Sequence, residues 1–149
     1  MSFGQTKVDN SIFAVLPYNS SEHWIFNNCK NAQLNDNEYI IIESLLEKCV
    51  TEYNFESEKR FNEITKKYPN YKFNKNNYII DLKEYKRQYI AVTNDKGEKE
   101  VWINCFCDNF DSNWKKVLML VDDGGKCFFN LKINLTTGKY YDFRVNGLA

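Results

Sequence analysis

The chain has 149 residues, of which 43% are hydrophobic and 16% aromatic, and its 20 acidic and 20 basic side chains cancel. A domain of this length buries roughly two-thirds of its unfolded surface, so it can hold a core without metals or disulfides. The aromatic content excludes a disordered chain, and the zero net charge argues against binding of nucleic acid. The length predicts one domain, residues 1–149. No run approaches the roughly 18 apolar residues of a membrane span, so we expect no such span.

The N-terminal segment, residues 1–33, has little periodicity and is expected to lie irregularly across a larger element. Residues 12–16 are an apolar run long enough for one strand, which Pro17 stops. Ser2-Phe3-Gly4 places small residues where a signal peptidase cuts, although the preceding charged and apolar regions are missing. This remnant favours a periplasmic or secreted protein, and the alternative is an ordinary terminus of a cytoplasmic one.

A helical region is predicted over residues 36–67. Asn35 is a good N-cap and Glu38 is its capping-box partner, while Leu34 and Tyr39 suit a hydrophobic staple. Apolar residues then repeat at helical spacing to residue 53, and a weaker helical stretch over 55–67 ends before Pro69.

After residue 78 the apolar period changes to two, which is typical of strands. Turn residues separate five predicted strands, at 85–93, 99–107, 117–121, 127–135 and 140–145. Short turns join neighbouring strands antiparallel. The predicted fold is therefore α+β, with the helix packed on one face of a five-stranded antiparallel meander that spans residues 78–149.

The five cysteines are an odd number without C-x-x-C spacing, so at least one thiol stays free. Cys105 and Cys107 lie two residues apart on a predicted strand and therefore point to the same face. Parallel side chains of this kind do not favour a disulfide between them. We expect both to fill the core beside Val101 and Ile103, and we expect no essential disulfide.

Catalytic and cofactor motifs are absent from the sequence. His23 is the only histidine and has no nucleophile motif around it, and the chain has neither a P-loop nor a G-x-G-x-x-G motif. We therefore expect no enzymatic activity, no cofactor and no metal. The stretch from Lys66 to Lys75 mixes basic and aromatic residues as nucleic-acid surfaces do, but without an RNP-like pattern a solvated loop is favoured.

Alternation along the strands sorts their side chains into two faces. The nearly pure apolar set, expected to face the helix, is Ile90, Val92, Val101, Ile103, Cys105, Cys127, Phe129, Leu131, Ile133, Tyr141, Phe143 and Val145. The other face is rich in residue types that are enriched at interface hot spots. The predicted partner-binding residues on it are Tyr85, Arg87, Tyr89, Trp102, Phe106, Phe128, Tyr140 and Arg144.

This aromatic face allows two interpretations. In one, the N-terminal segment with Phe13, Leu16, Trp24 and Phe26 folds over it and buries the aromatic rings as a third layer. In the other, part of the face stays open and receives another protein or a second copy of the chain.

A family resemblance rests on the C-terminal half. The residues from Arg87-Gln88-Tyr89 through Val121-Asp122-Asp123-Gly124-Gly125 to Tyr140-Tyr141-Asp142-Phe143-Arg144-Val145-Asn146-Gly147 resemble a group of small uncharacterised bacterial proteins that are often exported. The layout of residues 34–149 is also similar to β-lactamase-inhibitor-like and PepSY-like modules. The resemblance implies a binding or inhibitory role, by analogy of fold.

Three functions are therefore considered, of which the last is a structural or envelope protein without a discrete site. The first is a non-enzymatic protein-binding module, an inhibitor or immunity protein that docks a partner on its aromatic sheet face. The second is a small-ligand carrier or enzyme with a cavity between helix and sheet.

The helix start gives a first testable prediction. Asn35→Ala should lower the free energy of unfolding by about 1 kcal/mol, because the first turn loses its capping acceptor. Chemical denaturation of wild type and variant measures this difference. Unchanged unfolding midpoints would place the start of the helix elsewhere.

Overall fold

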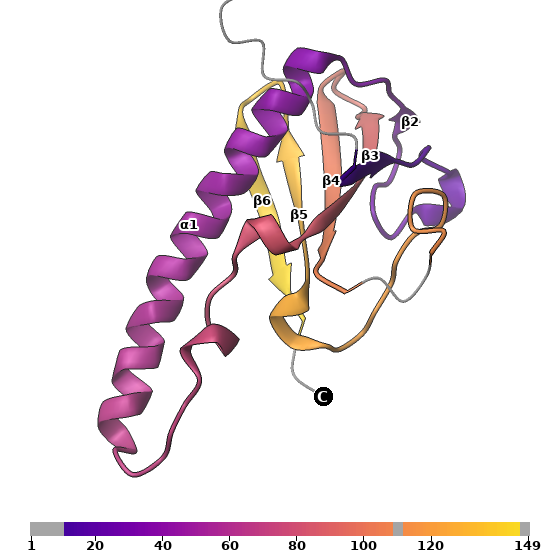
Figure 1. Ribbon diagram of the computed structural model, residues 1–149. Coiled ribbons are helices and arrows are strands. Elements are labelled where there is room, and N and C mark those ends of the chain that lie inside the picture. The colour runs from indigo at the N-terminus through magenta and orange to yellow at the C-terminus, as the bar shows by residue number, and fades with distance from the viewer. Residues whose placement is uncertain (1–10, 109–111, 147–149) are drawn as a thin grey trace, which may run out of the picture.

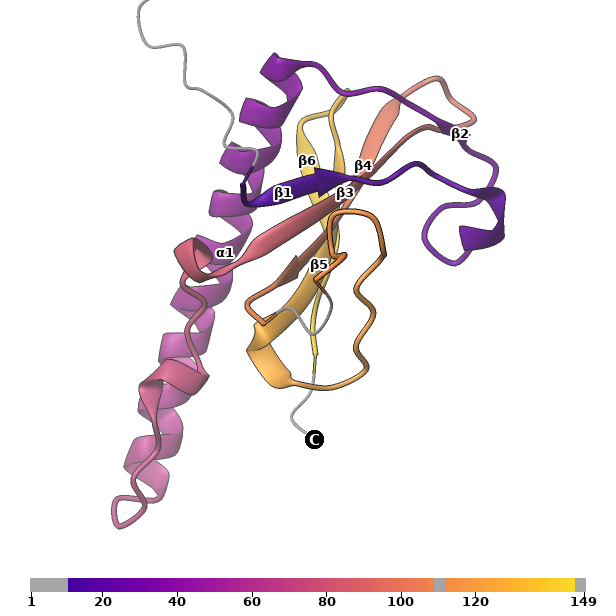
Figure 2. The ribbon, with the colours of Figure 1, turned by 45° about the vertical axis from the view of Figure 1, so that its right-hand side comes forward.

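The computed structural model describes residues 11–108 and 112–146. One long helix, α1 (Asp36–Lys67), crosses one face of a six-stranded sheet, and irregular segments cover the opposite face (Figures 1 and 2). We term these two faces of the sheet the helix face and the far face. The proposed signal-peptidase remnant, Ser2–Gly4, lies outside the described residues.

The sheet is mixed, with the strand order β1-β3-β4-β5-β6. Its four long strands pair antiparallel in chain order: β3 (Lys86–Thr93), β4 (Lys99–Phe106), β5 (Phe128–Asn134) and β6 (Lys139–Val145). From the N-terminal segment, β1 (Phe13–Val15) adds parallel to β3 and β2 (Lys30–Asn31) adds antiparallel to it. The predicted five-stranded antiparallel meander is therefore confirmed only in its β3–β6 part. Short 3-10 turns occupy Ser20–Glu22, Lys75–Asn77, Leu82–Glu84 and Gly125–Cys127.

The strand predicted at residues 117–121 is wrong. β4 pairs directly with β5, and the chain between them leaves the sheet and crosses its far face. The expected hairpin turn at residues 122–125 is wrong for the same reason, although Gly124 does adopt a positive φ of 97°. A Cβ atom at Gly124 would lie 2.6 Å from the ring of Phe128, so a side chain there would clash as well as strain the backbone.

The predicted start of α1 is confirmed. Asn35 Oδ1 accepts from the backbone N–H of Glu38 at 2.9 Å, and Glu38 Oε1 accepts from that of Asn35 at 3.0 Å, which completes the capping box. The two predicted helical stretches form one continuous helix. It ends at Lys67, two residues before Pro69, as the sequence predicts.

The core between α1 and the sheet is filled by side chains from both layers. Its buried members are Ile42, Leu46, Cys49, Val50, Ile80, Tyr85, Tyr89, Ala91, Val101, Ile103, Cys105, Phe129, Leu131 and Ile133. The cavity that the second function would need between helix and sheet stays a prediction.

The face assignment of β3 corrects the sequence analysis. Tyr89 pairs with Ile103, and both belong to the core against α1, whereas Ile90 and Val92 pack on the far face with Trp102. The aliphatic residues of β3 were expected on the helix face because they are the most apolar. Since both faces of this sheet are buried, apolarity alone does not identify the face.

The far face carries two smaller hydrophobic clusters. The first joins Ile90, Val92 and Trp102 to Leu16, Ile25 and Phe26 of the N-terminal segment. The second joins Phe106 and Phe128 to Ala14, Trp114 and Met119, of which the last two belong to the excursion between β4 and β5. The third-layer interpretation is therefore confirmed for Trp102, with the additional cover of residues 112–121. It is wrong for Phe13, which packs on the helix side against Tyr39 and Tyr89.

Two buried amide side chains hold this excursion on the sheet. Gln88 Nε2 donates to the carbonyl oxygen of Val117 at 2.7 Å, and its Oε1 accepts from the backbone N–H of Met119 at 2.9 Å. Asn104 Nδ2 donates to the Met119 carbonyl at 2.6 Å and to Gln88 Oε1 at 3.1 Å. These bonds satisfy backbone groups that would otherwise be buried without partners, so the segment needs no strand pairing.

Burial of Trp102 gives a stability prediction. Its side chain is 4% exposed, so Trp102→Ala should lower the free energy of unfolding by about 3–5 kcal/mol. The matched control is Trp24→Ala, because Trp24 is 53% exposed and meets Trp102 edge-on at a centroid distance of 5.7 Å. We expect the control to lose about 1 kcal/mol or less. Equally small losses in the two variants would contradict the third layer.

Candidate functional site

Most of the predicted partner-binding residues are inside the protein. Six of the eight are at most 5% exposed, and the helix-facing Tyr140 is half-buried, which leaves Arg144 as the one exposed member. The six buried residues are Tyr85, Arg87, Tyr89, Trp102, Phe106 and Phe128. The predicted open aromatic face is therefore not a surface of this chain, and partner binding through it is corrected accordingly.

Three of these residues have structural partners on the helix side. Arg87 Nε lies 2.9 Å from Glu43 Oε1, and the Tyr89 hydroxyl donates to the same oxygen at 3.0 Å. Burial lowers the pKa of Arg87, but the Glu43 carboxylate outweighs this, and the net direction is upward. The third, Tyr85, donates its hydroxyl to the carbonyl oxygen of Lys126 at 2.6 Å. These side chains tie the sheet to its surroundings rather than to a partner.

A β-bulge explains the position of Tyr140. The pairing of β5 with β6 shifts by one residue beside Asp142, whose φ is +53°. Tyr140 and Phe143 therefore both face α1, and Tyr141 points to the far side, where its hydroxyl donates to Glu100. The faces predicted for Tyr140 and Tyr141 are therefore wrong, because strict alternation along a strand does not allow for a bulge.

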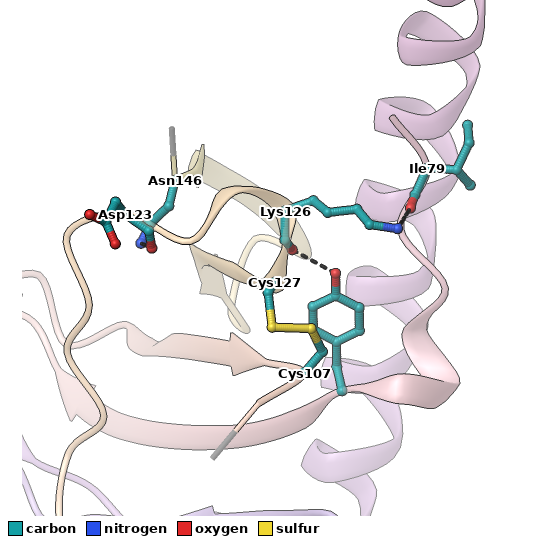
Figure 3. The surroundings of a disulfide bond; sticks show 7 residues. Ile79, Cys107, Asp123, Lys126, Cys127 and Asn146 are labelled. Carbon is teal, nitrogen blue, oxygen red and sulfur yellow. Dashed lines mark hydrogen bonds between the residues drawn. A yellow bond between two sulfur atoms is a disulfide. The ribbon is translucent and has the colours of Figure 1, made fainter. Parts of the chain in front are cut away.

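Cys107 corrects the cysteine prediction. The chain leaves β4 after Phe106, and the exposed Cys107 forms a disulfide with Cys127, their Cα atoms 5.0 Å apart (Figure 3). Cys105 fills the core as expected. The disulfide closes the excursion that covers the far face.

The remaining thiols are poor nucleophiles at neutral pH. Burial raises the pKa of Cys49 to about 12 and also raises the pKa of Cys105 and of the half-buried Cys29. Because the thiolate is the reactive form, these groups stay in their unreactive state.

Neither a metal-binding cluster nor a membrane-spanning helix occurs in the described part of the chain, residues 11–108 and 112–146. No three His, Cys, Asp or Glu side chains in it gather closely enough to hold a metal ion. No helix in it combines the length and apolar character that crossing a membrane requires.

The remaining candidate is a projection that we term the arm, residues 54–80. Figure 1 shows the second half of α1 running past the end of the sheet, with the following segment returning along it. Asn54 holds the returning segment by two hydrogen bonds of 2.8 Å to the backbone of Ile80. The Ser57 hydroxyl donates to the carbonyl oxygen of Tyr78, and Lys75 forms a 2.9 Å ion pair with Glu58. The arm is thus built by specific polar contacts.

The tip of the arm carries a groove of about 630 Å³. It is lined by Ile64, Tyr68, Tyr71, Lys72, Phe73, Asn74, Asn77 and Tyr78. Tyr71 is 65% exposed and Tyr68 is 50% exposed. Tyr71 stays this exposed even though its ring contacts that of Phe73 at a centroid distance of 4.5 Å. The sequence analysis interpreted this stretch as a solvated loop. Its mixture of aromatic and basic residues was the available signal, but the groove forms only when the return segment docks on α1.

A second groove, of about 500 Å³, lies at the hairpin end of the sheet and is lined by both polar and apolar side chains. Its most buried acid, Glu100, accepts a 2.9 Å bond from Asn94 and a bond from the Tyr141 hydroxyl. The bonds of Glu100 are therefore made within the groove, which makes it the weaker candidate.

Comparison with known proteins adds no assignment. No protein-family model, no curated protein and no solved structure matches this chain. The resemblance to inhibitor-like and PepSY-like modules stays a prediction.

The Cys107–Cys127 disulfide predicts that reduction destabilises the protein, whereas the sequence led us to expect no essential disulfide. Reduction should lower the free energy of unfolding by about 3 kcal/mol, the chain-entropy value for a closed loop of this size. Thermal melts with and without reductant measure the change. The control is the double variant Cys107→Ala/Cys127→Ala, whose melts should coincide. Coinciding melts of the wild type would instead restore the expectation of no essential disulfide.

Proposed function

We propose that this protein is a non-enzymatic binding module that holds a partner protein on the tip of its arm. The observation that carries the proposal is the exposure of Tyr68 and Tyr71 around a groove. Tyrosine is enriched where interfaces concentrate their binding energy, because a large rigid ring loses little entropy on docking. The proposed partner-binding surface therefore moves from the sheet to the arm.

The arm adds little to the core of the domain. Of its residues 54–80, Ile80 alone belongs to the buried cluster between helix and sheet. The arm is nevertheless held in shape by Asn54 and Ser57 and by the Phe61–Tyr78 ring contact at 5.3 Å. A surface that is already ordered before binding loses less conformational freedom when the partner docks, which supports docking as its use.

The compartment and the class of partner belong to the same proposal. Disulfides persist mainly in oxidising compartments, so the Cys107–Cys127 bond supports the expected periplasmic or secreted location. An inhibitor or immunity role fits a compact exported binding protein, and the resemblance stated from the sequence supports it by analogy.

Site-specific photo-cross-linking in the native host tests the proposal. A benzophenone amino acid placed at Tyr71 should give one discrete adduct, because the probe reaches into the occupied groove. The matched control places the same probe at Tyr141, which is 39% exposed and lines the second groove rather than the groove of the arm. We expect no adduct there. Mass spectrometry identifies the protein in the adduct.

Two further results decide the interpretation. Adding Tyr68→Ser should abolish the Tyr71 adduct and leave the melting temperature nearly unchanged, because exposed substitutions alter stability by about 0.5 kcal/mol. An adduct of twice the chain's mass would identify the partner as a second copy. Equal labelling from the arm and from the control position would contradict a dedicated site on the arm.

A further inference from the structure

The lysines of the arm tip follow the last acid of α1, Glu63, and no further acid occurs up to residue 80. Residues 64–80 contain Lys66, Lys67, Lys72 and Lys75 and no aspartate or glutamate. Lys75 is neutralised by Glu58 across the arm, but Lys72 lines the groove and Lys67 Nζ lies 5.6 Å from the centre of the Tyr68 ring. Positive charge therefore borders the aromatic groove directly.

Helix capping explains only part of this charge. Lys66 and Lys67 lie in the last turn of α1, where cations stabilise the negative end of the helix dipole. Lys72 lies beyond the helix and is exposed, so that effect gives no reason for it.

We propose that the groove binds a short acidic segment of the partner protein. An apolar or aromatic side chain of that segment occupies the groove, and its carboxylates pair with Lys67 and Lys72. This inference rests on the proposed function and names the chemistry of the partner at that same site.

The volume of the groove favours a linear segment. About 630 Å³ lies within the roughly 300–1,000 Å³ of sites that enclose a single small ligand, which is room for only a few side chains. A rigid protein–protein interface needs about 800 Å² from each partner, which a groove of this size does not supply by itself.

The rest of the arm favours a peptide over a nucleic acid. Glu52, Glu56, Glu58 and Glu63 are all exposed along the second half of α1. Glu56 and Glu58 pair with Lys59 and Lys75, whereas Glu52 and Glu63, the latter one turn from Lys67, form no ion pair within the residues that the structure describes. A nucleic acid long enough to extend beyond the tip would approach these carboxylates and be repelled. A short acidic peptide can end before it reaches them.

Fluorescence anisotropy with defined probes tests the inference. The probe is a labelled peptide of about twelve glutamates interrupted by two central tryptophans, and the comparison peptide has glutamine in place of every glutamate. The acidic peptide should bind at least tenfold more tightly than the glutamine peptide. Raising sodium chloride from about 50 mM to about 500 mM should remove most of that difference, because exposed charges are screened.

Charge-removing variants locate the binding. Lys67→Gln/Lys72→Gln should weaken binding of the acidic peptide at least tenfold, whereas Lys96→Gln/Lys139→Gln, at exposed positions of two hairpins, should change it less than twofold. All four substitutions are on the surface, and unchanged thermal melts show that the fold is intact.

Several outcomes would overturn the inference. These are no binding of the acidic peptide at about 1 mM, equal affinity for the two peptides, and tighter binding of a poly-dT oligomer of the same length. Any of them together with a discrete Tyr71 adduct would leave the proposed function standing and refute only the acidic partner. Loss of the adduct alone would refute the proposed function instead.

Discussion

The central strands carry apolar side chains on both faces of the sheet. The rest of the structure depends on covering each of these two faces with a layer of its own. Ile103 on one face and Ile90 on the other are both fully buried. A single helix covers only one face of a sheet, so the second face needs another layer. The chain supplies that layer from two irregular pieces, the N-terminal segment and the excursion between β4 and β5.

Each layer is fixed to the sheet by a polar contact as well as by apolar packing. Arg87 and Tyr89 bind Glu43 on the helix side, and Gln88 with Asn104 binds the excursion on the far side. Since neighbouring residues of a strand point to opposite faces, consecutive positions of β3 hold different layers. Side chains of the kind that form interfaces between proteins are used here within one chain.

The arm is the part of the fold that this double burial does not require. Its base is nevertheless anchored, because Asn54 binds Ile80 and Lys126 Nζ donates to the Ile79 carbonyl at 2.6 Å beside the disulfide (Figure 3). The tip beyond this anchor keeps Tyr71 exposed. An anchored base with an exposed aromatic tip suits a docking element better than a solvated loop, whose side chains need no defined position.

Local features of this protein were determined by the sequence itself. Several features depend on residues that are close together in the chain: the capping box at Asn35, the end of α1 before Pro69, and the β3–β4 and β5–β6 hairpins. Their energies come from backbone geometry and neighbouring side chains, so a local pattern is enough to predict them.

Features that need distant residues were decided only by the tertiary structure. Three features depend on which layer covers which face of the sheet: the face of β3, the coil at residues 117–121 and the pairing of Cys107 with Cys127. Alternating side chains along a strand do not tell the two faces apart when both are buried. The groove on the arm likewise exists only because Tyr78 and Ile80 return to α1. A segment such as residues 68–78 looks solvated in the sequence because its partners on the helix are about 20 residues away.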